Sequence, residues 1–69
     1  MAREAHLEAA KYHLEAASKH LAAVERYNEG DARGAERHSE DAWVASQCAD
    51  SKSVEAHRMS KVAVKMKLV

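Results

Sequence analysis

Histidine is the residue type in this chain best suited to chemistry. Three histidines are spaced seven apart, at His6, His13 and His20, and two more follow at His38 and His57. Imidazole binds metals and transfers protons near neutral pH. Seven residues of helix span about 10.5 Å, whereas zinc–nitrogen bonds are about 2.0 to 2.1 Å long. Two members of the column therefore cannot share one ion. We predict no metal and no other cofactor, and if a metal binds, these five histidines are the candidate ligands.

Serine offers a second possible chemistry. Four serines recur at intervals of seven, at Ser39, Ser46, Ser53 and Ser60. We expect them to fill a small-residue packing column rather than to lie beside a base, which nucleophilic catalysis would require. The two glycines, Gly30 and Gly34, do not form a phosphate-binding loop. The sequence therefore predicts a protein that is not an enzyme.

The histidines belong to three consecutive heptads, and only a helix returns residues to one side at that period. The same heptads produce a leucine column (Leu7, Leu14, Leu21) and a column of small residues (Ala10, Ala17, Val24). A further alanine column (Ala9, Ala16, Ala23) lies beyond the histidines. The pattern predicts a helix over about residues 3–28.

A turn is predicted over about residues 29–31. Gly30 suits the left-handed end of a helix, and Asp31 can accept hydrogen bonds from the first amides of the next one. Alanine then recurs every seven residues from Ala35 to Ala63, which predicts one long helix over about 32–66. Residues 62–69 alternate with a period of two, so a strand or a disordered end competes with helix there. The chain is interpreted as one domain, residues 1–69.

In a hairpin centred near Gly30, the sequence predicts which residues of the two helices lie at the same height, that is, at the same distance from the turn along the helix axis. Residues whose numbers sum to about 60 would face each other, which brings His20 near His38, Glu40 or Asp41. The same rule places His6 within about one turn of His57. The histidine column would be partly desolvated by helix packing, and desolvation disfavours imidazolium. Stability is then expected to fall as the pH drops from about 6.5 to 5.

Size and composition favour self-association. The chain has 69 residues, one cysteine and no Phe or Pro, and below about 70 residues a single core seldom supplies more than about 3 to 5 kcal/mol. Two helices cannot enclose a core. We therefore predict an all-α antiparallel hairpin that dimerises into a four-helix bundle. Its predicted interface residues are Leu7, Ala10, Leu14, Ala17, Leu21, Ala42, Trp43, Ala49, Ala56 and Met59.

Charge is balanced overall but unevenly distributed. Residues 1–50 carry 6 basic and 10 acidic side chains, whereas residues 51–69 carry 5 basic and 1 acidic. Acids near the start and lysines near the end of the second helix suit its dipole. The basic end also leaves nucleic-acid contact as a lesser alternative. No stretch has the roughly 18 apolar residues of a membrane span, and we expect a cytoplasmic protein that does not bind membranes.

Part of the chain is similar to known helical patterns. Ala23, Gly30, Asp31, Ala35 and Ala42 fall where a tetratricopeptide helix pair places its small residues and its turn. The alanine- and histidine-rich hairpin resembles small bacterial proteins of that style. The resemblance covers about residues 16–44 and supplies one unit, whereas stable arrays need at least three. It implies helix packing and protein binding. The overall design also resembles the Rop-type RNA-binding hairpins of plasmids, although alanines and histidines stand where basic and polar groups would contact RNA.

These observations predict a small helical homodimer used in protein–protein interaction or assembly, with another helical protein as a further candidate partner. A metal-binding or pH-responsive histidine stripe is the chief alternative. Rop-like nucleic-acid binding through the basic end is the third.

Overall fold

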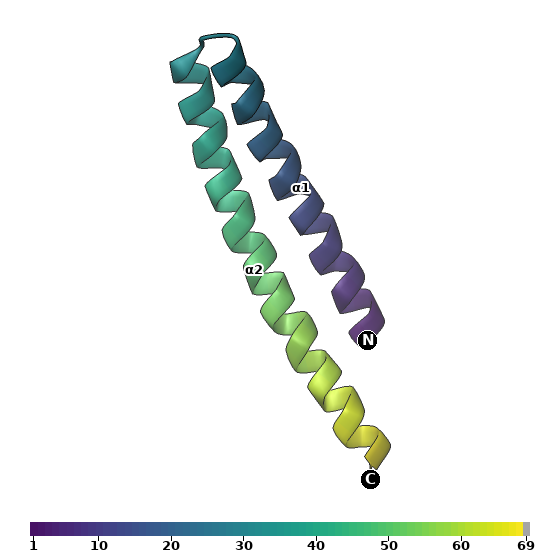
Figure 1. Cartoon of the computed structure of the whole chain (residues 1–69). Coiled ribbons are helices and arrows are strands. Elements are labelled where there is room, and N and C mark those ends of the chain that lie inside the picture. Colours follow the sequence, from purple (N-terminus) through teal and green to yellow (C-terminus); the bar gives the residue numbers. More distant parts are fainter. Residues whose placement is uncertain (69) are drawn as a thin grey trace.

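The chain forms two long helices packed side by side in opposite directions (Figure 1). The computed structural model describes residues 1–68 and the side chains of residues 1–66. Helix α1 spans Ala2–Asn28 and helix α2 spans Ala32–Leu68. The predicted helical hairpin is confirmed, with both helices starting and ending close to the expected residues. Helix continues through Leu68, so the strand considered for residues 62–69 does not form over 62–68, and Val69 lies outside the described residues.

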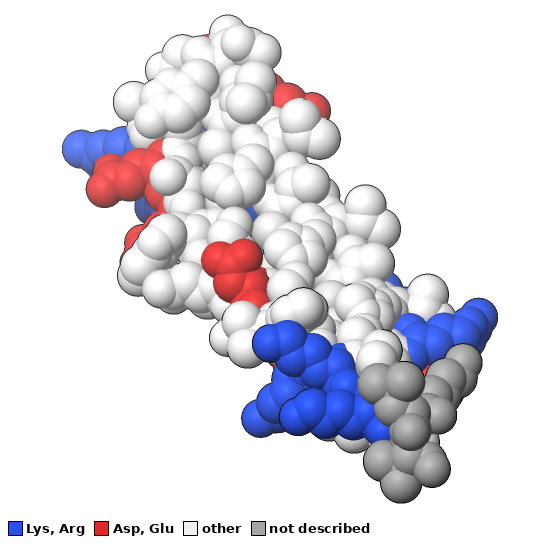
Figure 2. Space-filling model, turned by 60° about the horizontal axis from the view of Figure 1, so that its bottom comes forward, with Lys and Arg blue, Asp and Glu red and all other residues white. Residues whose placement is uncertain are grey.

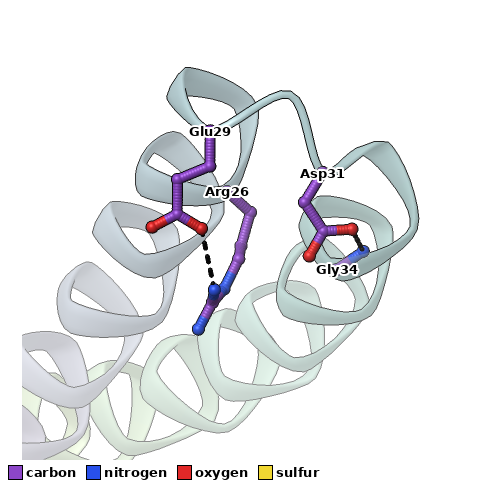
Figure 3. A network of polar contacts seen from close by, with 4 residues as sticks. All are labelled: Arg26, Glu29, Asp31 and Gly34. Carbon is purple, nitrogen blue, oxygen red and sulfur yellow. Dashed lines mark hydrogen bonds and ion pairs between the residues drawn. The ribbon is translucent and has the colours of Figure 1, made fainter.

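The turn between the helices is built as the sequence predicts (Figure 3). Gly30 has φ 77°, the left-handed conformation that a side chain disfavours. The amide of Asp31 donates to the carbonyl of Arg26 at 2.9 Å, which closes the last turn of α1. Asp31 Oδ1 then accepts from the amide of Gly34 at 2.9 Å and caps α2. Arg26 Nη1 pairs with Glu29 Oε1 at 2.9 Å across the end of α1.

The capping aspartate also explains the glycine at position 34. A Cβ at Gly34 would collide with the Asp31 carboxylate and press on Arg26 Cδ. Gly34 therefore leaves space for the cap, a role that the sequence did not reveal.

The two helices meet along a seam made of alanine. Among the residues with described side chains, the buried apolar ones are Ala9, Ala16 and Ala23 of α1 and Ala35, Ala42, Ala49 and Ala56 of α2. We call these seven residues the alanine seam. A side chain of one methyl group allows close helix approach but removes little apolar area from water. The leucine column of α1, which was predicted to lie in a dimer interface, is exposed in the single chain (Leu7 47%, Leu14 71%, Leu21 64%).

Helix α2 is the longer of the pair, with 37 residues against 27. Helix α1 ends and α2 starts at the same turn, so the last part of α2 continues past the first residues of α1 (Figure 1). The molecule measures 58 × 13 × 11 Å. It is a rod one helix pair thick, in which every side chain outside the seam, among residues 1–66, has access to solvent.

Candidate interaction face

Three histidine–serine contacts run along one side of the alanine seam. The distance between His Nε2 and Ser Oγ is 2.7 Å for His6–Ser60, 2.7 Å for His13–Ser53 and 3.3 Å for His20–Ser46. Either partner can be the donor, because the tautomer of the imidazole decides which. We call these three pairs the histidine–serine ladder. The prediction that the serines would not lie beside a base is wrong for these three serines.

The register of the ladder differs from the predicted one. The numbers in each pair sum to 66 rather than about 60, so His20 contacts Ser46 and His6 contacts Ser60. Helical side chains lean toward the N-terminus of their own helix. In antiparallel helices the two leans are opposite, so side chains meet whose Cα atoms lie at different heights. The simple counting rule omitted this lean.

The ladder lacks the other parts of a nucleophilic site. Activation of serine by histidine normally needs a third group that orients the imidazole and donors that stabilise an oxyanion. Within residues 1–68, no hydrogen bond joins a ladder histidine to a carboxylate. All three ladder histidines are also exposed. What the geometry supports is a row of polar cross-links between helices.

The five candidate metal ligands do not converge in one chain. Over the described residues, no group of three or more His, Cys, Asp or Glu side chains could hold an ion. His38 is half-buried and His57 is exposed. Cys48 is exposed, and its thiol is free.

Beyond the ladder, the surface of α1 stays uncharged. Steps of four residues advance about 40° around a helix, so the order from the seam outward is Ala9, His13, Ala17, Leu21. No Lys, Arg, Asp or Glu occupies these columns between residues 6 and 28. Three such steps separate the leucines from the seam column, an angle of about 120°. They are exposed on the ladder side of the hairpin.

On α2, the columns beyond the ladder mix apolar and charged residues, for example Trp43 with Glu36 and Asp50. The same steps of four lead from Ala35 through Ser39 to Trp43 and Gln47. Trp43 is 61% exposed, and Val54 and Val64, farther along these two columns, are 70% and 58% exposed. We call the ladder with the flanking columns of both helices the ladder face.

The opposite flank of the seam is charged. Lys52 Nζ lies 3.1 Å from Glu8 Oε1 and 5.2 Å from the centroid of the Tyr12 ring. The hydrogen bond to Glu8, followed by its negative charge, raises the pKa of Lys52. We call this side the Lys52 flank.

The ten predicted interface residues divide between the seam and the surface. Ala42, Ala49 and Ala56 lie in the seam, and Met59 is half-buried. The other six are exposed: Leu7, Ala10, Leu14, Ala17, Leu21 and Trp43. All six lie on the ladder face. The α1 column that contacts α2, Ala9 with Ala16 and Ala23, was not among the ten.

Lys and Arg gather at the end of the molecule that holds the C-terminus, whereas uncharged residues cover most of the rest of that view (Figure 2). Arg58, Lys61 and Lys65 are exposed there.

Neither helix, as far as the structure describes them, contains a stretch long and apolar enough to cross a membrane. Comparison with known protein families, curated proteins and solved structures finds no match to this chain.

Proposed function

We propose that this protein is a non-enzymatic assembly module that forms a homodimeric four-helix bundle through its ladder face. The observation that carries the proposal is the contrast between the seam and the surface. Seven alanines make up the buried apolar residues in the part whose side chains are described, while Leu14, Leu21 and Trp43 are each more than 60% exposed.

The energetic argument follows from side-chain size. Full burial of a leucine-sized side chain contributes about 1.5 to 3 kcal/mol, and alanine contributes much less. A seam of alanines therefore leaves the hairpin weakly stabilised for a chain of this length. Packing a second copy against the ladder face would bury the three leucines and Trp43. Ala10 and Ala17 beside the leucines would allow a close approach.

The histidine–serine ladder is suited to lie within the contact between two copies. In each pair the imidazole Nε2 and the serine Oγ are hydrogen-bonding partners within the same chain. A second copy could cover these atoms without leaving them unpaired, and unpaired buried polar atoms cost about 1 to 3 kcal/mol each.

The test is Leu14→Glu, examined by sedimentation equilibrium. Leu14 is 71% exposed in the single hairpin, so the change should leave the hairpin helical while it places a charge in the dimer contact. Val44→Glu is the matched control, since it adds the same charge at an exposed valine beside Tyr12 and Lys19, on the Lys52 flank.

The proposal predicts a dimer for the native chain and for the control, and a shift toward monomer for Leu14→Glu. Equal dimerisation of the two variants would show that the dimer uses another face. A native chain that stays monomeric and cooperatively folded at micromolar concentration would refute the proposal.

A further inference from the structure

We infer that acid opposes the dimer, so that association through the ladder face weakens as the ladder histidines take up protons below about pH 6.5. The inference rests on the proposed dimer and names its regulation. It is carried by the position of the three imidazoles, which form one row along the middle of the face that a second copy would cover.

The single hairpin can take up these protons without losing the ladder. All three histidines are exposed, so water can solvate an imidazolium at each position. Both nitrogens of an imidazolium donate hydrogen bonds, and a serine hydroxyl accepts as well as donates. The contacts of His6, His13 and His20 with their serines therefore have a donor and an acceptor in either charge state.

A second copy changes the surroundings of the same row. Covering the ladder removes water from the imidazole rings, and loss of water disfavours their charged form. The α1 columns of the ladder face supply no carboxylate to offset this loss, because they hold no charged side chain between residues 6 and 28. Protons therefore bind more weakly to the covered ladder than to the exposed one, and proton binding favours the separate chains.

Charged groups beside the ladder do not reverse this balance. On α2, the column next to the ladder serines places Asp50 and His57 at the height of the ladder, and Glu36 lies about 15 Å before the first of these serines. Asp50 favours imidazolium, whereas His57 adds another imidazole, and Arg3 of α1 lies about one turn from His6. A second copy brings the same groups, so imidazoles outnumber carboxylates beside both ladders.

The size of the effect follows from the ordinary titration of histidine. At pH 5.5, one unit below the usual value of about 6.5, an imidazole in water is about tenfold more often charged than neutral. Each imidazole that has to stay neutral in the dimer therefore raises the dissociation constant about tenfold between pH 7.5 and pH 5.5. One such imidazole in each dimer is enough for a measurable change.

The test is sedimentation equilibrium at pH 7.5 and pH 5.5, at one ionic strength. The native chain is compared with His6→Gln/His13→Gln/His20→Gln, because a glutamine amide also bonds a serine hydroxyl but takes up no proton in this range. His38→Gln is the matched control. His38 is half-buried and belongs to the heptad column of Lys52, on the opposite flank of the seam.

We expect the dissociation constants of the native chain and of His38→Gln to rise at least about tenfold at pH 5.5. That of the triple variant should stay nearly constant. A native dimer of equal affinity at both pH values, or a triple variant that responds like the native chain, would overturn the inference and leave the dimer standing. A native chain that is monomeric at pH 7.5 would overturn both.

Dilution calorimetry of the native dimer at pH 6 tests the same inference without a variant, which matters if the triple variant does not dimerise. Measurements in buffers of different ionisation enthalpy count the protons exchanged when the dimer dissociates. The inference predicts that dissociation takes up protons, because the uncovered imidazoles return to water. Dissociation without proton uptake would contradict it.

Discussion

The two flanks of the alanine seam connect the same pair of helices by different means. On one flank, three neutral side-chain contacts repeat every heptad, at 2.7, 2.7 and 3.3 Å, beside exposed leucines. On the other, Lys52 lies between Glu8 and Tyr12 in a charged setting. A charged flank is well solvated, and covering it would require removing water from ions. Around the ladder itself less charge has to be desolvated, so this flank is the one that a second molecule can cover at lower cost.

The comparison also explains how a hairpin with so little buried surface keeps one register. Alanine packs closely but does not prevent sliding, since one alanine resembles the next. The ladder and the Lys52 pair each fix which residue of α1 lies beside which residue of α2. The ladder does so without charges, which leaves its side of the hairpin available for contact.

The largest loss of stability is expected from a substitution in the alanine seam, because the contacts of both flanks require the two helices to pack there. Ala49 is 0% exposed, so Ala49→Leu overfills the contact and should lower the free energy of unfolding by about 1 to 3 kcal/mol. Urea unfolding at low protein concentration measures it. Ala17→Leu is the control, because Ala17 is exposed on the ladder face. Its effect on the single hairpin should stay within about 0.5 kcal/mol. Equal effects at both positions would mean that the seam is not a close contact.

A smaller loss of stability is expected when one histidine–serine pair of the ladder is removed. Ser53→Ala removes the hydroxyl that lies 2.7 Å from His13 Nε2 and should cost about 0.5 to 1 kcal/mol relative to Ser51→Ala. Ser51 is exposed on the same helix, so both changes gain the same helix propensity. Thermal unfolding compares the two variants. Identical melting temperatures for Ser53→Ala and Ser51→Ala would show that the His13–Ser53 contact does not stabilise the hairpin.

On the charged flank, Glu8→Gln should lower the melting temperature only slightly, because the pair it breaks is solvent-accessible. The loss should disappear at about 1 M salt, where the Debye length falls to about 3 Å. The effect of Ser53→Ala should persist at that salt concentration. If Glu8→Gln lowered the melting temperature equally at low and high salt, the Lys52 flank would be stabilised by packing rather than by charge.

The smallest effect is a pH dependence above neutrality. Glu8 raises the pKa of Lys52 in the folded chain, so this interaction stabilises the fold below the pKa of the unfolded state. The contribution is lost as the pH rises through the higher folded value, above about pH 10. Melting curves from pH 8 to 11 should show a slightly steeper decline for the native chain than for Glu8→Gln. Parallel declines would show that Lys52 carries no pH-dependent stability.

The sequence was sufficient to predict the helices and their turn. Heptad spacing defines a helix wherever it occurs, and Gly30 followed by Asp31 carries both the left-handed residue and the cap. These features are local, so neighbouring residues decide them. The length of α2 followed from an alanine column that continues without a break.

The contact between the helices was harder to predict, because α1 carries two columns of small residues. The column of Ala10 and Ala17 adjoins the leucines, and both columns were therefore assigned to the predicted interface. The column of Ala9, Ala16 and Ala23 is the one that faces α2. An unbroken alanine column on α2 packs closest against another unbroken one, and Val24 interrupts the first candidate. The ladder was missed for a related reason, since its pairs depend on side-chain lean as well as on helix height.

The dependence of thermal unfolding on protein concentration tests the central claim most directly. If a hairpin with an alanine seam gains its stability from a second copy, the dimer binds the folded state by mass action. Circular dichroism at 222 nm over a hundredfold range of concentration should then show a melting temperature that rises with concentration. The native mass at the upper end should be twice the 7.6 kDa of one chain. A melting temperature independent of concentration, with a cooperative transition and a mass of 7.6 kDa throughout, would contradict the account.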